Sequence, residues 1–144
     1  MKIKRIKMYK ILLSYIKDLS VETPNAETLI YVKDKISSYN LGIEIKSKAL
    51  KNKMVEVSTK LSFLDKDVSE KKSIFELDYA TIVKFEDEIN DKKILEKILL
   101  CDVQNSIYPK LEKIFTNLIN DAGYPGVKFD KKIDFEKLYN ERVN

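Results

Sequence analysis

Histidine is absent from this sequence, cysteine occurs once, and glycine occurs only three times in 144 residues. Histidine is the commonest general base and metal ligand, so its absence removes the most frequent route to acid–base catalysis. A single thiol excludes a zinc site built from thiolates. Gly42 is isolated, and Gly123 and Gly126 flank a Tyr-Pro turn, so no phosphate-binding loop is formed. These absences argue against an enzyme, and neither a metal nor a cofactor is expected.

Paired cysteines and long apolar runs are also lacking. Cys101 can form no disulfide within the chain, which suits a reducing compartment. It follows three apolar residues at positions 98–100, a context typical of a small buried side chain. No apolar run approaches the ~20 residues of a membrane span, and no signal-peptide cleavage site follows the basic start. We therefore expect a cytoplasmic protein without membrane insertion.

Basic charge is concentrated at the N-terminus. The chain has 27 basic and 23 acidic residues, and five of the basic ones lie in residues 1–10, where no acid occurs. We expect a basic, partly flexible arm over residues 1–12 and a single domain over residues 13–144. The arm suits contact with nucleic acid, so a nucleic-acid-binding module is one alternative function. No basic stripe with interleaved aromatic residues supports that alternative elsewhere. The basic residues of the arm are Lys2, Lys4, Arg5, Lys7 and Lys10.

Alternation of apolar and polar residues predicts four β-strands in the first half of the chain. The first strand covers residues 13–22 and ends before Pro24, which lacks a backbone donor. Further alternating runs cover residues 41–49, 55–63 and 75–81, and their short spacing favours antiparallel pairing. The apolar residues of one parity in the first strand, expected to share a face, are Leu13, Tyr15, Leu19 and Val21.

Helical periodicity dominates the second half. Apolar residues cluster at helical spacing between about residues 86 and 100, and a clear stripe extends over residues 107–119. Pro109 fits near the first turn of this second helix, and Gly123 fits its C-terminal cap. A short helix then follows near residues 135–139. The order of elements predicts an α+β fold: a four-stranded antiparallel sheet with two main helices on one face and a short C-terminal helix.

This predicted sheet carries more apolar side chains than two helices can cover. Apolar surface left exposed on a protein usually marks a partner interface, and a groove beside a sheet suits an extended peptide. The residues expected to line such a groove are Ile43, Ile45, Val55, Val57, Phe75 and Tyr124.

Five short segments form a pattern that extends from about Tyr15 to Tyr139. They are residues 16–26 (Ile-Lys-Asp-Leu-Ser-Val-Glu-Thr-Pro-Asn-Ala), 75–78 (Phe-Glu-Leu-Asp), 105–109 (Asn-Ser-Ile-Tyr-Pro), 123–125 (Gly-Tyr-Pro) and 134–139 (Asp-Phe-Glu-Lys-Leu-Tyr). Each segment alone is weakly specific. Their order and spacing on the predicted strands and helices resemble the SecB family of export chaperones.

The resemblance implies an ATP-independent chaperone that holds unfolded polypeptides in long apolar grooves and keeps them competent for translocation. It also implies a homotetramer, built as a dimer of dimers, that passes its clients to SecA through an acidic sheet face. The acidic positions expected to form this face are Asp18, Glu22, Glu76 and Asp78, although Glu76 stands where the family usually has an apolar residue. The positions on the opposite strand face, expected to support assembly, are Leu77, Tyr79 and Thr81.

The sequence also departs from the family pattern. Its calculated pI is about 8.9, it has no acidic tail after the closing helix, and Gln104 replaces the usual proline. An alternative function follows, because some SecB-like proteins serve one client, the antitoxin of a toxin–antitoxin–chaperone module. A small-ligand or enzymatic protein is a further alternative, which the absence of histidine disfavours, and a purely structural oligomer is another.

Overall fold

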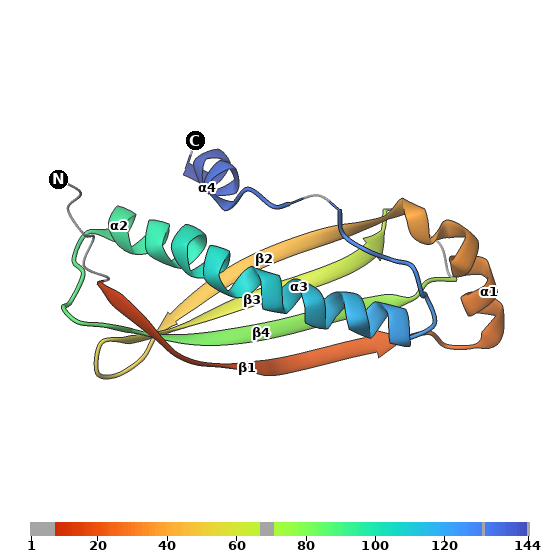
Figure 1. Cartoon of the computed structure of the whole chain (residues 1–144), viewed down its shortest axis with the longest axis horizontal. Helices are drawn as coiled ribbons and strands as arrows, with labels where there is room; N and C mark the ends of the chain where they lie inside the picture. The colour runs from red at the N-terminus through yellow and green to blue at the C-terminus, as the bar shows by residue number, and fades with distance from the viewer. Residues whose placement is uncertain (1–7, 67–70, 131, 144) are drawn as a thin grey trace.

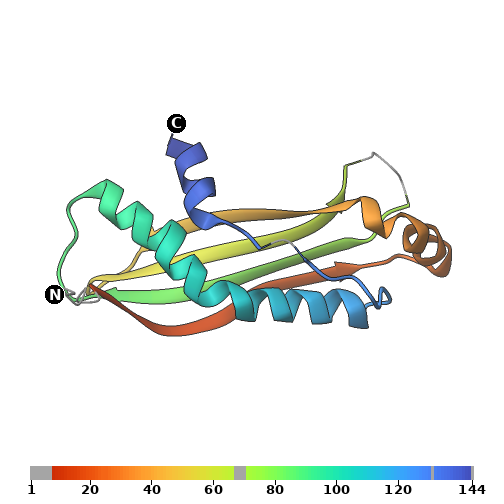
Figure 2. The ribbon, with the colours of Figure 1, turned by 45° about the horizontal axis from the view of Figure 1, so that its top comes forward.

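The computed structural model describes residues 8–66, 71–130 and 132–143. Four antiparallel strands form one sheet in the order β1-β4-β3-β2, which makes β1 and β2 its edges. The helices of the second half cross one face of this sheet, so the predicted α+β fold is confirmed (Figure 1, Figure 2). The elements are β1 (Tyr9–Glu22), α1 (Ala26–Lys35), η1 (Ile36–Ser38), β2 (Tyr39–Ala49), β3 (Met54–Asp65), β4 (Ile74–Phe85), α2 (Lys92–Lys97), η2 (Ile98–Asp102), α3 (Val103–Asp121) and α4 (Phe135–Val143).

The core lies between the sheet and α3, because the apolar stripe of the helix meets the alternating apolar side chains of β3 and β4. In β4, Phe75 and Leu77 are completely buried, whereas their polar neighbours are not. This alternation distinguishes a helix-covered face of the sheet from an uncovered one. The buried residues of the predicted helical stripe are Ile107, Leu111, Phe115 and Ile119.

Strand β1 does not keep one parity along its length. Two β-bulges interrupt its pairing with β4, and each inserts an extra residue that moves the following side chains to the other face. Leu13 and Tyr15 therefore lie on the uncovered face, whereas Leu19 and Val21 lie on the helix-covered face. The prediction that these four side chains share a face is wrong. The second bulge falls at Lys17, where the alternation in the sequence breaks.

Helix α1 was not among the predicted elements. Asn25 caps its N-terminus, because the Asn25 Oδ1 accepts a hydrogen bond from the Thr28 N–H at 2.9 Å. The helix fills the connection between β1 and β2 and buries Thr28 and Val32. The sequence signal was limited to the cap, since an apolar stripe is weak in this segment.

The first of the two main helices starts later than expected, and the second starts earlier. Residues 86–90 are not helical, and α2 begins at Lys92 after Asp91, whose carboxylate accepts from the N–H groups of Lys93 and Ile94. Helix α3 begins at Val103, so Pro109 lies inside it and not in its first turn. The η2 segment, a turn of π-helix, joins α2 to α3 and makes them one interrupted rod.

The N-terminal boundary also shifts. Strand β1 begins at Tyr9, whose ring lies 6.4 Å from that of Phe85, so the predicted division after residue 12 falls inside the strand. Four of the five basic arm residues, at positions 2, 4, 5 and 7, lie outside the described residues. Within the described ranges, no helix is both long and apolar enough to cross a bilayer.

Candidate functional site

A series of depressions follows the edge strand β2 on the helix-covered side of the sheet. Four of them, of about 650, 660, 190 and 340 Å³, succeed one another from the α1 end of β2 to the α2 end. Each shares lining residues with the next, and Leu41, Ile43 and Ile45 of β2 form their common wall. We call this series the β2 groove. Its other walls are the loop after α3, helix α4 and the η2 turn.

Three of the six residues predicted to line a groove do line this one. Ile43 and Ile45 form its β2 wall, and Tyr124 lies at its α1 end. Val57 and Phe75 are completely buried under the helices and belong to the core. Val55 is partly buried at the hairpin end of β3, outside the lining. Sequence parity correctly predicts the shared face, but it cannot distinguish a central strand from an edge strand.

A hydrogen-bond cluster holds Tyr124 in place. The Tyr124 hydroxyl lies 2.6 Å from the Ser73 Oγ, which lies 2.7 Å from the Thr23 Oγ1. The Ser73 N–H donates to the Tyr39 hydroxyl at 3.1 Å, and burial raises the pKa of Tyr39. The Tyr124 ring also packs edge-on against Phe75, with ring centroids 5.6 Å apart. Strand ends from three parts of the chain therefore fix this end of the groove.

The turn that carries Tyr124 depends on glycine. Gly123 has a φ of +123°, and a Cβ there would lie 2.9 Å from the Leu29 Cδ1, so both the backbone and the packing favour glycine. The Asn120 side chain closes the turn: its amide donates to the Val127 carbonyl at 2.9 Å, and its Oδ1 accepts from the Gly126 N–H at 3.1 Å.

The C-terminal helix forms the outer wall of the groove near its middle. Phe135, at the start of α4, is buried and packs edge-on against Tyr108. Its carbonyl accepts from the Cys101 thiol at 3.6 Å. Cys101 is fully buried, as its sequence context predicts, and burial raises its pKa. Leu138 lines the groove from the exposed side of α4. Sequence reasoning missed this residue as a groove residue, together with Leu41 and Phe129.

The uncovered face of the sheet is divided by charge. Its acidic end lies where β1 finishes and β4 begins, and it brings together all four predicted docking residues. Asp18 pairs with Asp78 across the two strands, Glu76 lies one row further and Glu22 two rows further. Among the described residues, the Asp78 Oδ1 is buried without a hydrogen-bond partner. Adjacent carboxylates repel one another, so this arrangement favours a cationic partner.

Lysines occupy the opposite end of the same face. Lys10 pairs with Lys84 in neighbouring strands, and Lys48 of β2 pairs with Glu56 of β3. Lys46 lies beside them, one row toward the middle. The basic pI of the chain therefore coexists with a distinct acidic end, because the strand register separates the two signs of charge.

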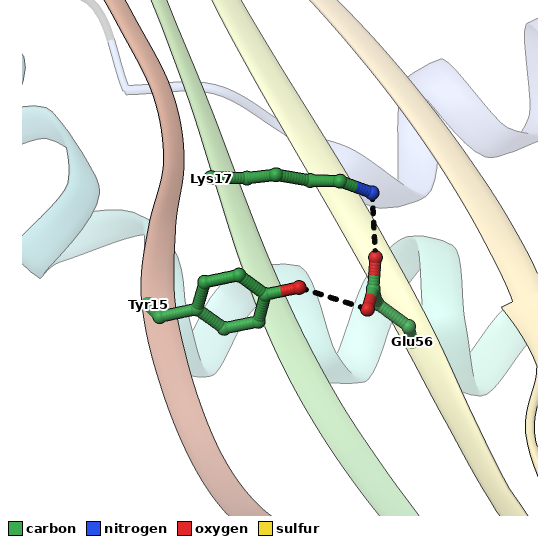
Figure 3. Close-up of polar contacts among 3 residues, drawn as sticks. All are labelled: Tyr15, Lys17 and Glu56. Atoms are coloured by element: carbon green, nitrogen blue, oxygen red, sulfur yellow. Dashed lines mark hydrogen bonds and ion pairs between the residues drawn. The ribbon is translucent and has the colours of Figure 1, made fainter.

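A three-residue cluster marks the boundary between the two ends (Figure 3). Glu56 accepts hydrogen bonds from the Lys17 Nζ at 2.8 Å and from the Tyr15 hydroxyl at 2.9 Å. These bonds lower the pKa of Glu56, with the Lys17 bond the larger cause, and they raise the pKa of both Lys17 and Tyr15. The cluster ties β1 to β3 across the intervening β4.

The three residues expected to support assembly lie on the helix-covered face. Leu77, Tyr79 and Thr81 are 0%, 4% and 0% exposed within a single chain. The Thr81 Oγ1 lies 3.1 Å from the Ser14 Oγ of β1. Any effect of these residues on assembly would therefore act through the elements that cover them.

Exposed apolar side chains concentrate instead on the edge strand β1. This concentration was missed because the sequence does not indicate which strand has no neighbour on its outer side. The large apolar residues of β1 that are at least 38% exposed are Leu12, Leu13, Tyr15, Ile16, Leu19 and Val21.

An open apolar groove, two sheet edges and a charged sheet face define a class of protein that binds other polypeptides. Residues 4–144 match the family model described as preprotein translocase subunit SecB. A SecB-type protein of Pelagibacter ubique is 56% identical over 136 residues, which cover 94% of this chain and 97% of the relative. The protein-export protein SecB of Parvibaculum lavamentivorans is 31% identical, over 92% of this chain and 77% of its own length.

The chain belongs to the SecB family of protein-export chaperones. Its fold is also that of a solved SecB-like chaperone from Mycobacterium tuberculosis, in complex with a peptide from the HigA1 antitoxin. The two structures match with a TM-score of 0.65 and 12% identity, over 87% of this chain and 91% of the other. The resemblance inferred from the five sequence segments is confirmed.

Proposed function

We propose that this SecB-family chain acts without ATP and without catalysis of its own, and that the β2 groove is where it holds unfolded polypeptides. The continuity of the groove along Leu41, Ile43 and Ile45 is the observation that carries this proposal. Its successive depressions suit an extended chain better than a compact ligand.

The edge position of β2 adds a second source of affinity. Within the described sheet β2 pairs only with β3, so its outer row of backbone groups is available to an incoming strand. An extended client would place alternate side chains toward the groove while its backbone pairs with β2. Main-chain pairing is independent of sequence, which suits a chaperone for many clients.

An aggregation assay tests the proposal. A chemically unfolded client is diluted into buffer with a stoichiometric amount of the protein, and light scattering is followed over time. We expect delayed scattering without added nucleotide. A Leu41→Ser/Ile43→Ser variant, which changes only partly exposed groove residues, should lose the effect and keep its fold by circular dichroism. Unchanged scattering with the wild-type protein would refute the proposed function.

The acidic end of the sheet face is the proposed docking site for SecA. Asp18, Glu22, Glu76 and Asp78 support this role because they adjoin one another on one face of the sheet. Two lysines lie near them: the Lys60 Nζ is 3.7 Å from Glu76, and Lys17 interacts electrostatically with Asp78. Leu77, Tyr79 and Thr81 are proposed to support assembly indirectly, by holding in place the helices that cover them.

The protein is proposed to act in the cytoplasm as a homotetramer. Assembly of this homotetramer is proposed to begin at β1. An edge strand with six exposed apolar side chains pairs readily with another copy. Pairing two β1 strands would bury these side chains and leave each β2 groove open on the outer side. A dimer of dimers would then follow from contacts between the helical layers.

Dedicated service to one antitoxin is a second candidate function. The SecB-like neighbour from Mycobacterium tuberculosis holds an antitoxin peptide, which supports this candidate for the fold. The genes beside this one distinguish the two functions. A toxin–antitoxin pair there, with the antitoxin binding more tightly than unrelated unfolded chains, would favour dedicated service, whereas equal binding would favour general export.

A further inference from the structure

The junction between α2 and α3 contains a buried polar contact that joins it to the sheet. Gln104 is completely buried, and so is Thr59 of β3. The Thr59 hydroxyl donates to the Gln104 Oε1 at 3.0 Å, and the Gln104 Nε2 donates to the Leu99 carbonyl at 3.3 Å. Burying an amide side chain is costly unless its polar atoms are bonded. The Gln104 side chain therefore bonds the Leu99 carbonyl on the helical side and the Thr59 hydroxyl on the sheet.

The Leu99 carbonyl lies in the η2 turn, where the backbone hydrogen bonds differ from those of an α-helix. In a regular α-helix it would accept from the Val103 N–H, four residues on. Here the Val103 N–H reaches the Ile98 carbonyl, five residues back, as a π-turn requires. The Val103 N–H therefore does not occupy the Leu99 carbonyl, and the Gln104 Nε2 donates to that carbonyl from the side.

The same turn forms the wall of the groove at its α2 end. Leu99 and Leu100 line the depression opposite Ile45, and Leu100 also lines the next one with Ile43. Thr59 is the direct pairing neighbour of Ile45 in the β2–β3 ladder. Contacts therefore extend from Ile45 through Thr59 and Gln104 to Leu99, and they connect the β2 wall of the groove to its η2 wall at this end.

We infer that Gln104 is a positioning residue for the β2 groove: it holds the η2 turn to β3 and thereby sets the spacing between Leu100 and Ile45. This inference rests on the proposed function, because the groove is taken as the client site. Without the amide, the turn can return to α-helical register, which rotates Leu100 away from the groove. The wall at this end is then displaced although the core remains.

Two variants separate positioning from stability. Gln104→Leu removes the amide but leaves the Thr59 hydroxyl buried without an acceptor. Thr59→Val/Gln104→Leu removes both side-chain polar groups, so it should recover much of the lost stability while the Leu99 carbonyl still lacks the side-chain donor. Ser106→Ala is the matched control, because the Ser106 Oγ also donates to a helix carbonyl, that of Asp102, at an exposed site away from the groove.

The readouts are the methyl NOE between Leu100 and Ile45, urea unfolding, and affinity for reduced, carboxymethylated lactalbumin, which stays unfolded in native buffer. We expect both Gln104 variants to lose the NOE and to bind the client about fivefold to tenfold more weakly, the loss expected when one leucine keeps only part of its burial against the client. The Ser106→Ala protein should match the wild type in all three.

A double variant that keeps both the NOE and the wild-type affinity would overturn the inference and reduce Gln104 to a purely structural residue. Failure of the wild-type protein to bind the client is a different result, because it refutes the proposed function. The NOE would then still decide whether Gln104 sets the position of the groove wall.

Discussion

Glu56 illustrates how a single side chain couples charge to the sheet. It is the acceptor for both Lys17 and Tyr15, and these bonds hold the pKa of its carboxyl below the ordinary value of 4.5. A lowered pKa means that the folded state favours the ionised form. The resulting stability is present in full above about pH 4.5 and is lost as pH falls through the folded pKa.

Glu56→Gln is therefore expected to reduce stability at neutral pH and to have a diminishing effect below about pH 4.5. The free energy of unfolding, measured in urea at several pH values for both proteins, checks this. Glu44→Gln is the matched control, since its exposed carboxylate on the neighbouring strand forms an ion pair with the exposed Lys46 at 3.3 Å. Parallel pH profiles for wild type and Glu56→Gln would contradict the argument.

The sequence predicts that Phe75 and Ile43 both line the groove, but Phe75 is completely buried and Ile43 is only partly buried. Phe75→Ala should destabilise the fold by about 3–5 kcal/mol, because the ring is completely buried. Ile43→Ala should cost about 1 kcal/mol, because the side chain is only partly buried, yet it should weaken client binding. Urea unfolding and client affinity measured together test this contrast. Equal stability losses would show that Ile43 belongs to the core.

At the scale of the element, the strands were easier to predict than their positions in the sheet. Residue alternation identifies β2, β3 and β4 because each keeps its parity throughout. It fails for β1, whose two bulges exchange the faces, and for strand order, which depends on contacts distant in sequence. The η2 turn was also not predictable, because the polar contact that holds it to the sheet, between Gln104 and Thr59, joins residues distant in the sequence.

The edge strand β1 can be tested as an interface between copies of the chain. Leu19→Lys places a charge on a side chain that is 44% exposed in one chain. If β1 pairs with a second copy, the variant should shift the mass measured by light scattering toward the monomer, because a buried unpaired charge is costly. Ile30→Lys on α1, at a residue 67% exposed, is the control and should keep the wild-type mass. An unchanged mass for Leu19→Lys would exclude this edge as the interface.

For the whole molecule, the proposed docking of SecA predicts that the position of the charges on the sheet face affects binding, in addition to the net charge. Glu76→Gln/Asp78→Asn should weaken binding of purified SecA by about tenfold, since these charges would meet the partner directly. Lys46→Glu/Lys48→Glu, at the opposite end, should leave binding unchanged or strengthen it. Calorimetry at low and high salt measures both effects, and the wild-type affinity should fall with salt. Equal losses for both variants would contradict the proposed docking site, because the two variants change the charge of the face in opposite directions.

The two edges of the sheet give the assembly a further property. If β1 joins copies and β2 holds clients, every added copy brings another binding site without altering the existing ones. A long unfolded chain could then occupy several grooves at once, and each engaged segment would raise the local concentration of the next. Retention of a client would then depend on its length: short or partly folded chains would escape quickly, while long unfolded ones would dissociate slowly although each single contact is weak.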